Sequence, residues 1–396
     1  MASAQGGREA AGRHGAFVTG PRRRGAYRGR VAISPEYLNQ FTEPVGYLDH
    51  ARVGPLSKAV RTTAASLLEE LAKPGPGTVT TLLNREASRA KQAVARACRT
   101  DADHVVLEPN TSTALFQTAF NLARGEVLVS TGEFPANLYP WVRAEQLGLA
   151  RVRWMPPGPV TPERVRAAIT PETSVVSVSA VSFRTGYRAD LAALRDVVGD
   201  RLLVVDAIQG FGVVDEPWEV ADVLVSGGQK WLRAGHGTGF AVLSDRALER
   251  MQPVLSGWTG ARDADVFDDR VHEPLPTAQA WSLTYLSPVS AGMLATALEL
   301  VELAGVGAIA ARIEERLREF DSVLEGAGAR IVSERERRAG ILVFEVPGRP
   351  APKVADALAA EGITVSVRGP HVRLSAHAST SPEAVKMVEA ALSRAR

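Results

Sequence analysis

Short apolar runs recur between residues 104 and 244, and most are separated by helical or loop-like stretches. Runs that stay apolar at successive positions are typical of strands covered on both faces. The expected strands are HVVLE, EVLVS, RVRWM, SVVSVSAV, LLVVD, DVLVS and GFAVLS. Helical periodicity precedes them at residues 57–72 and 86–98. Strands that alternate with helices predict an α/β fold, with a largely parallel sheet flanked by helices.

The pattern changes near residue 288, and the remainder indicates a smaller α+β domain. Two helices are expected first, the earlier one capped by Ser287 with Pro288 in its first turn. The runs GILVFEV, ITVSV and HVRLS then predict strands, and TSPEAVKMVEAAL predicts a final capped helix. We therefore expect a large domain at residues 31–287 and a small C-terminal domain at residues 288–396.

Residues 1–30 carry no such pattern. They are rich in glycine, alanine and arginine, include the run Arg22, Arg23 and Arg24, and contain Glu9 as their only acid. This composition predicts a disordered basic tail without the apolar core of a signal segment. We favour a solvated leader over an arm that binds nucleic acid or a membrane.

Composition narrows the possible partners and compartments of the chain. The formal net charge of the 396 residues is +2, which gives no indication of nucleic acid as a partner. No apolar run approaches the roughly 20 residues that a membrane span needs. Cys98 is the only cysteine, which excludes an internal disulfide and suits a reducing cytoplasm. Its helical surroundings favour a core thiol over a nucleophile.

Several common catalytic patterns are missing from the sequence. There is no HExxH, and His371 and His377 stand without partners, so we expect no metal site. There is no GxSxG elbow and no GxxxxGK[ST] phosphate loop. GHGTGF is a weak dinucleotide signal, because no strand directly precedes it. Simple hydrolase, kinase and dehydrogenase readings are therefore poorly supported.

Two strand ends carry the residues that chemistry could use. Asp206 ends the run LLVVD, at the edge where open α/β sheets bind their ligands, and Gln209 follows one turn later. The run DVLVS is followed by GGQK, which ends at Lys230 directly before Trp231. Pyridoxal phosphate needs an imine-forming lysine and a carboxylate to hold its pyridinium nitrogen protonated. Lys230 and Asp206 suit those roles, and Gln209 could reach the phenolic oxygen.

Pyridoxal phosphate also needs donors for its phosphate. EPNTSTALFQTAF places Asn110, Thr111, Ser112 and Thr113 directly before a helix, where hydroxyl and amide groups suit an anion. Taken singly, Thr111 and Ser112 are ordinary helix caps, and Asp206 is compatible with a structural ion pair. In this order, each at a strand end, the residues favour the cofactor site.

These segments resemble the aminotransferase class V family of fold-type I pyridoxal-phosphate enzymes over residues 45–394. YLDHARVGPLSKAV is similar to the family's YLDNAATTPL opening, and NTSTALFQTA to its GTTEAINLVA phosphate segment. VVDAIQGFG resembles its VVDAAQxxG cofactor strand, and GGQKWLRAGHGTGF its lysine loop. STGEFPANLYPW, SFRTGYRADLAAL and the closing VSVRGPHVRLSAHASTSPEAVKMVEAAL also resemble family segments. The family includes cysteine desulfurases, isopenicillin N epimerase and hercynylcysteine sulfoxide lyase.

The resemblance implies a role for each matching residue. Lys230 matches the Schiff-base lysine, Asp206 the partner of the pyridine nitrogen and Gln209 the phenolate partner. Arg373 matches the arginine that holds the substrate α-carboxylate, although a surface arginine is the alternative reading. The resemblance also implies a homodimer, with GHGTG and its Thr238 near the neighbouring subunit's cofactor phosphate. The remaining phosphate positions fall on Thr111, Ser112 and Ser226.

Departures from the family pattern bear on the reaction. Phe134 replaces the histidine that stacks on the cofactor ring in desulfurases, which keeps the stacking but cannot transfer protons. The desulfurases' mobile cysteine loop is missing before Arg373, and Cys98 lies far away in sequence. His50 replaces the opening asparagine and Arg184 could reach the substrate, but structural roles are at least as plausible for both.

We therefore expect a pyridoxal-phosphate enzyme that acts on an amino acid or an amino-acid conjugate. Phe134 and the short carboxylate loop favour a C–S (β-eliminating) lyase over a cysteine desulfurase. Transamination and epimerisation share the same early chemistry and remain open alternatives. A cofactor-free regulatory scaffold is disfavoured, because the residue set is intact.

Overall fold

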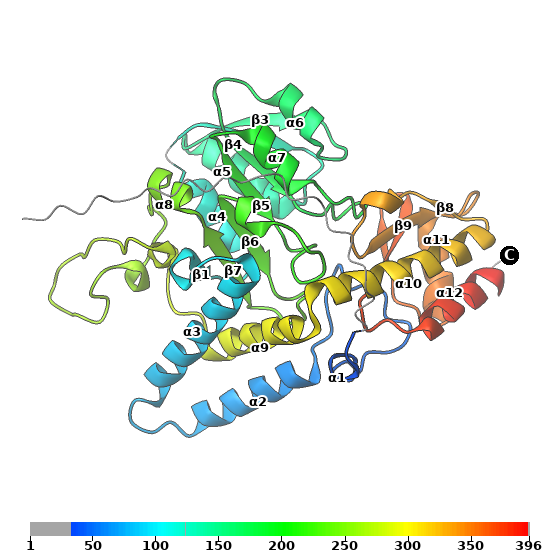
Figure 1. Ribbon diagram of the computed structural model, residues 1–396, viewed down its shortest axis with the longest axis horizontal. Coiled ribbons are helices and arrows are strands. Elements are labelled where there is room, and N and C mark those ends of the chain that lie inside the picture. The colour runs from blue at the N-terminus through cyan, green and yellow to red at the C-terminus, as the bar shows by residue number, and fades with distance from the viewer. Residues whose placement is uncertain (1–32, 123, 395–396) are drawn as a thin grey trace, which may run out of the picture. The chain divides into compact units, whose positions relative to one another are not determined.

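A seven-stranded sheet organises the first part of the chain in the computed structural model, which describes residues 33–122 and 124–394 (Figure 1). Its strands lie in the order β1-β7-β6-β5-β4-β2-β3. Only β7 runs antiparallel to its neighbours, which confirms the largely parallel sheet. The strand bounds are β1 (Val105–Leu107), β2 (Glu126–Ser130), β3 (Arg151–Met155), β4 (Thr173–Ser179), β5 (Leu202–Asp206), β6 (Val223–Gly227) and β7 (Gly239–Leu243). The predicted tail at residues 1–30 lies outside the described residues.

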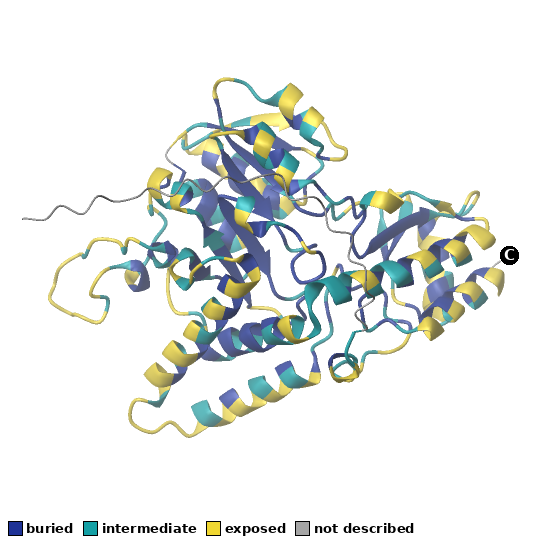
Figure 2. Ribbon diagram, in the orientation of Figure 1, coloured by how far each residue is buried: buried dark blue, intermediate teal, exposed yellow. Residues whose placement is uncertain are grey.

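Successive side chains of the central strands enter two different cores, one on each face of the sheet. In β5, Leu203 and Val205 belong to the core shared with α3 (Thr78–Cys98), whereas Leu202 and Val204 belong to the core shared with α4 (Thr111–Phe120). Every residue of β5 and β6 is buried, as Figure 2 shows for the centre of the sheet. This two-sided burial explains why these strands are continuous apolar runs.

Helices cover both faces of the sheet. The further helices of this part are α2 (Lys58–Ala72), α5 (Tyr139–Gln146), α6 (Pro162–Ala168), α7 (Leu191–Val198) and α8 (Asp245–Arg250), and a short α1 (Pro35–Leu38) precedes them. Helix α3 begins eight residues before the predicted start at residue 86, because Gly77 at φ +74 breaks the chain directly before Thr78. Cys98 is buried in the adjacent core, as expected for a core thiol.

A four-stranded antiparallel sheet forms the second part, in the order β10-β11-β9-β8. Its strands are β8 (Arg330–Ile331), β9 (Ile341–Glu345), β10 (Ser366–Arg368) and β11 (His371–Ser375), and its helices are α10 (Val306–Gly326), α11 (Ala351–Ala360) and α12 (Pro382–Arg394). Helix α9 (Pro288–Ala304) follows the boundary expected at residue 288, yet its buried residues join the core around α3. The separate core of the second sheet includes α10, together with residues from the N-terminal segment and Trp231.

Helices α9 and α10 follow each other directly and are bent at Gly305. No single described helix is long and apolar enough to cross a membrane, and these two meet that test only as a pair bent by 79°.

An extended segment near the beginning of the described chain joins the two sheets. Tyr47 forms a bridge with Thr364, and Asp49 forms one with Ser375 at the end of β11. The loop after β4 makes a second connection, since the Ala339 N–H donates to the Gly186 carbonyl. Residues far apart in the sequence thereby meet above the carboxyl ends of β4, β5 and β6.

Gly186 provides a test of this second connection. Its φ is +76, and a Cβ atom at this position would lie 2.6 Å from the Ile341 carbonyl oxygen. Gly148 has a similar φ of +72 but open space around it. We expect Gly148→Ala to lower the free energy of unfolding by about 1 kcal/mol, through the left-handed backbone alone. Gly186→Ala should cost roughly 1–3 kcal/mol more, because backbone must also move.

Urea unfolding of both variants measures the difference. Equal losses for Gly186→Ala and Gly148→Ala would show that the approach of Gly186 to β9 places no constraint on the fold.

Candidate active site

Three parallel strands bring their last residues to one edge of the large sheet. Ser179 of β4 is opposite Asp206 of β5, and Asp206 is opposite Val225 of β6. The chain that leaves β6 continues directly into the loop that carries Lys230. Asp206 and Lys230, which the sequence placed at separate strand ends, are close enough that each shifts the pKa of the other.

Lys230 lies in a loop whose backbone is held on both sides. The Gly54 N–H donates to the Gln229 carbonyl at 2.8 Å, and the Arg233 N–H donates to the Lys230 carbonyl at 3.1 Å. Burial lowers the pKa of the Lys230 ammonium to about 8, against the opposing effect of Asp206. The lowered pKa increases the fraction of this amine that is uncharged near neutral pH, which is the form that attacks a carbonyl.

Asp206 is buried beneath the lysine. One carboxylate oxygen accepts a hydrogen bond from the Ile208 N–H at 3.1 Å. Burial raises the pKa of Asp206 to about 6, although Ile208 and Lys230 both oppose the rise. A cationic N–H donor placed against the carboxylate would restore its charge, which is what a pyridinium nitrogen offers.

The start of α4 forms a cradle with Gly227 and Gly228 at the end of β6. The Thr111 hydroxyl is buried and has no hydrogen-bond partner among the described residues. A Cβ atom on Gly227 would lie 3.1 Å from that hydroxyl, so the glycine keeps the space open. Asn110 caps the helix by accepting a hydrogen bond from the Thr113 N–H at 2.9 Å. Thr111 and the exposed Ser112 are therefore not needed to cap the helix. An unsatisfied hydroxyl at a helix N-terminus fits a phosphate group.

Two residues expected to contact the cofactor, Ser226 and Thr238, form hydrogen bonds with nearby backbone carbonyls. The Ser226 hydroxyl is buried and donates to the Gly227 carbonyl at 3.3 Å. Thr238 is fully buried, and its hydroxyl donates to the Gly235 carbonyl at 2.6 Å. The contact of Thr238 with a neighbouring subunit's cofactor phosphate stays a prediction.

Gln209 makes contacts that differ from the expected one. Its amide nitrogen donates to the Ala51 carbonyl at 2.9 Å, and its amide oxygen accepts from the Trp231 indole at 2.8 Å. The side chain thus connects the strand end to the lysine loop and retains one N–H for another acceptor. Its contact with a phenolic oxygen stays a prediction.

Phe134 is partly exposed at the mouth of the site. Its ring centroid is 5.4 Å from the Lys230 ammonium nitrogen. Phe183 packs edge-on against this ring at 5.1 Å, and the sequence did not single it out. Arg184 follows Phe183 but is exposed, lies over the Phe183 ring at 5.1 Å and donates to the Gly132 carbonyl. The two aromatic rings form an apolar wall next to the lysine.

Arg373 is buried and already has an acidic partner. Its guanidinium donates to Asp49 at 3.3 Å and to the Phe183 carbonyl at 3.2 Å, while its Nε has no partner among the described residues. The pKa of Arg373 is lowered to about 10, first by burial and then by the charge of Arg368, while Asp49 opposes the shift. Asp49, which also accepts from Ser366, was missed because its partners are more than 300 residues away in the sequence.

His50 lies in a different polar cluster from Lys230. Its ring nitrogens face the Ser375 carbonyl at 3.1 Å and Glu43 at 3.7 Å, and His377 stacks on it at 5.2 Å. The expectation that His377 lacks partners was wrong, since candidate ligand atoms of Glu43, His50 and His377 lie within 4.8 Å of one another. Arg233 occupies both oxygens of Glu43, at 2.9 and 2.5 Å, so the carboxylate is paired by a cation of the chain itself.

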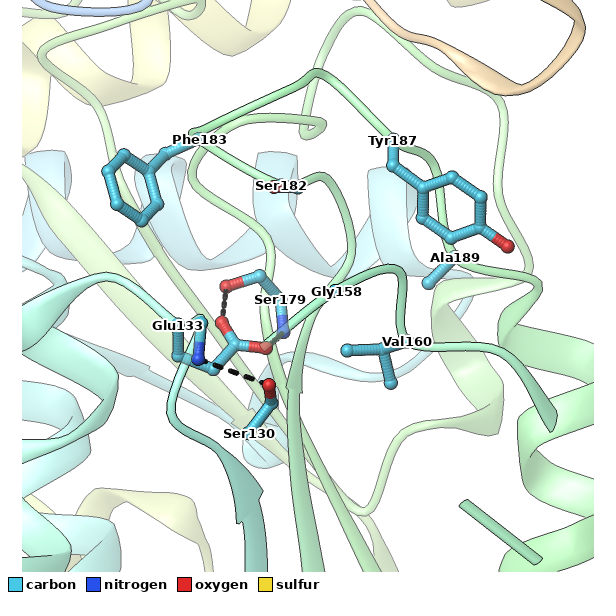
Figure 3. Close-up of a pocket in the computed structure, with 10 residues that line it drawn as sticks. Ser130, Glu133, Gly158, Val160, Ser179, Ser182, Phe183, Tyr187 and Ala189 are labelled. Atoms are coloured by element: carbon cyan, nitrogen blue, oxygen red, sulfur yellow. Dashed lines mark hydrogen bonds between the residues drawn. The ribbon is translucent and has the colours of Figure 1, made fainter. Parts of the chain in front are cut away.

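Glu133 is a buried acid next to Asp206 that the sequence did not suggest. Figure 3 shows it in a small pocket between the ends of β2 and β4, with Ser130 and Ser179. It accepts from the Ser179 N–H at 3.0 Å and from the Ser179 hydroxyl. Burial raises the pKa of Glu133 to about 7, Ser179 opposes the rise and Asp206 adds to it. A glutamate directly before Phe134 is its only signal in the sequence.

This protonation predicts a pH-dependent stability. The pKa of Glu133 is raised from 4.5 to about 7, so the folded protein retains a proton that the unfolded chain has lost between these values. The resulting stabilisation is complete below pH 4.5 and is lost as the pH rises through 7. Glu133→Gln should remove this loss, which amounts to roughly 2–3 kcal/mol.

Urea unfolding of the wild type and Glu133→Gln from about pH 5 to about pH 8 measures the effect. Asp206 titrates in both proteins, so the difference between their slopes isolates Glu133. The exposed Glu249→Gln on α8 is the control and should leave the slope unchanged. Parallel curves for Glu133→Gln and the wild type would contradict the protonation of Glu133.

Comparisons of the sequence with known proteins point to one family. Residues 47–394 match the Aminotransferase class-V family. A kynureninase from Deinococcus radiodurans is 30% identical over 219 residues, 52% of each chain. A probable cysteine desulfurase from Aeropyrum pernix is 35% identical over 195 residues, 44% of this chain and 46% of the relative. The chain thus spans about half the length of these curated relatives.

A solved structure shares the fold. The cystine C–S lyase C-DES, in complex with its reaction product cysteine persulfide, superposes with a TM-score of 0.78 at 19% identity. The match covers 88% of this chain and 97% of that chain. C-DES has also been solved with glycine linked to the pyridoxal-phosphate cofactor. Lys230, Asp206 and the Thr111 cradle fit the same group, and pyridoxal 5'-phosphate is the cofactor of this chain. The chain belongs to the aminotransferase class V family, and its fold is that of the fold-type I pyridoxal-phosphate enzymes.

Proposed function

We propose that this enzyme is a C–S lyase that eliminates a sulfur group from the β-carbon of an amino acid or amino-acid conjugate. The observation that carries the proposal is the tight turn between β10 and β11. Only Gly369 and Pro370 separate the two strands. The single cysteine, Cys98, is buried in the core, and burial raises the pKa of its thiol far above the ordinary value. No thiolate of this chain is therefore available to accept sulfur, so the sulfur product must leave.

The charge of each residue of the site indicates its role in binding the cofactor or in proton transfer. Pyridoxal phosphate, when bound, supplies an aldehyde that condenses with amino groups and a ring that withdraws electrons from the substrate α-carbon. Thr111 and the first N–H groups of α4 would hold the phosphate, and Asp206 would hold the ring nitrogen. Lys230, whose pKa is about 8, is placed to take a proton from the α-carbon and to return one. Phe134 and Phe183 form an apolar wall on one side of the lysine.

Product analysis tests the reaction. We expect pyruvate, ammonia and a sulfur product in equal amounts from a cysteine conjugate, without added keto acid, because elimination at the β-carbon needs no amino acceptor. Lys230→Ala should abolish turnover, and borohydride should fix the cofactor's mass on Lys230 in the wild type only.

Other products would assign another reaction. Turnover only with an added keto acid would indicate an aminotransferase, and an inverted amino acid without ammonia would indicate an epimerase. Release of alanine from cysteine would indicate a desulfurase. Wild-type protein that stays colourless with pyridoxal phosphate would favour a regulatory role.

We also propose that the enzyme is a homodimer. The segment between α8 and α9 exposes large apolar side chains, with Phe267 at 91% and Val271 at 101% exposed. Figure 2 shows this segment as an exposed excursion from the sheet. Unpaired apolar side chains of this size are typical of an interface. Val254, Trp258 and Val266 are exposed in the same segment.

Sedimentation velocity measures the association. The wild type should sediment as a dimer, and the double substitution Phe267→Asp with Val271→Asp should shift it toward the monomer, because two charges would enter an apolar contact. Leu147→Asp, at another exposed apolar position directly after α5, is the control and should leave the dimer intact. A monomeric wild type would contradict the proposal.

A further inference from the structure

One face of the β10–β11 hairpin carries two arginines toward the site. Ser366 is opposite Arg373, and Arg368 is opposite His371. Residues two apart on a strand share a face, so Ser366, Arg368 and Arg373 all lie on the same side of this hairpin. Arg373 contacts Asp49 and the carbonyl of Phe183, whose ring packs against Phe134. This face of the hairpin therefore borders the space above Lys230.

The two arginines differ in their partners. Arg373 is buried and forms an ion pair with Asp49. Arg368 is partly exposed, and its one described hydrogen bond is to the neighbouring Val367 carbonyl at 2.9 Å. Arg52, in the turn after Asp49, is exposed and has no acidic partner among the described residues. Two guanidinium groups at this face are thus available to an anion from outside the chain.

The charges around the lysine show how close these groups are. After burial, the positive charges of Arg373 and Arg368 lower the pKa of Lys230, while Asp206 and Asp49 raise it. Arg368 and Arg52 also lower the pKa of Arg373, which only Asp49 opposes. Asp49 is the carboxylate that pairs with Arg373, and Glu345 on the neighbouring β9 is already paired with Arg330 and His371. One anionic group of a substrate would leave this face with excess positive charge, whereas two would balance it.

We propose that Arg368, assisted by Arg52, binds a second anionic group at the side-chain end of the substrate. The substrate is then an amino-acid conjugate that carries a carboxylate or another oxyanion in addition to its α-carboxylate. This inference rests on the proposed function, because it places the α-carboxylate on Arg373. Guanidinium groups bind oxyanions through two parallel N–H donors, so this choice of residue suits such a group.

The hairpin makes this subsite rigid. Arg368 and Arg373 are fixed relative to each other by the register of β10 and β11 and by the hydrogen bonds of Ser366 to Asp49. A two-residue turn leaves little freedom for either arginine to move independently. The spacing between the two anionic groups of the substrate is therefore selected by the hairpin itself.

Calorimetric binding of two matched probes to the holoenzyme tests the proposal. Succinate carries two carboxylates, and succinamate has the same chain with one carboxylate replaced by an amide. We expect the wild type to bind succinate at least about tenfold more tightly than succinamate. Arg368→Gln should remove this preference and change succinamate affinity by less than about twofold. Arg52→Gln should reduce the preference in part.

Arg318→Gln is the control, since this exposed arginine on α10 lies outside the site, and it should keep the preference. Equal affinity of the wild type for both probes would overturn the proposal, as would a preference that survives in Arg368→Gln. The visible absorbance of the cofactor, recorded for every variant, separates these outcomes from a failure of the proposed function. Loss of that absorbance in the wild type would overturn the enzyme assignment rather than the subsite.

Discussion

The lysine loop is fixed by a buried ion pair between Arg233 and Glu43, and the geometry of the site depends on it. Arg233 is fully buried, takes a left-handed φ of 59°, and binds both oxygens of Glu43. Burial alone would raise the pKa of Glu43, but hydrogen bonds from His50 and Arg233 hold it well below its ordinary value. Removing one partner of such a pair leaves an uncompensated buried charge. The pair therefore fixes the position of the backbone three residues after Lys230.

The two residues after Lys230 enter different cores, which places the lysine at the junction of the two parts. Trp231 is buried in the core of the second sheet and Leu232 in that of the first. Gly54 lies so close that a Cβ atom would be 2.0 Å from the Lys230 carbonyl oxygen. The short segment from Glu43 to Gly54 thus contacts the lysine loop, and through Asp49 it also contacts Arg373. Cofactor attachment and substrate recognition depend on the same segment.

The helices and strands were predictable because a strand that is buried on both faces of the sheet needs a continuous run of apolar residues, which is visible in the local sequence. Most strands of the large sheet are apolar runs, although the edge strand β3 contains two arginines. Asp206 stands out because it ends one such run, and Lys230 because it follows another. The pair of Asp49 and Arg373 and the cluster of Glu43, Arg233 and His377 were not predictable. Their partners are brought together only by the folded chain, across 324 residues in the first case. Glu133 escaped notice for another reason, since its burial depends on the packing between β2 and β4.

Membership of the family does not by itself define the substrate, because the residues that would select it lie outside the shared framework. Asp206 ends a central strand, Lys230 follows another and Thr111 begins a helix, so their positions are set by the framework of the large sheet. The hairpin of β10 and β11 lies outside that framework, on the second sheet. Where a longer connection would let a nucleophile move toward the substrate, a two-residue turn instead holds charged side chains in a fixed register. Because the arginines of the hairpin are already held in place, less conformational entropy is lost when the substrate binds. Selectivity among substrates then follows from the spacing of these charges rather than from the closure of a loop.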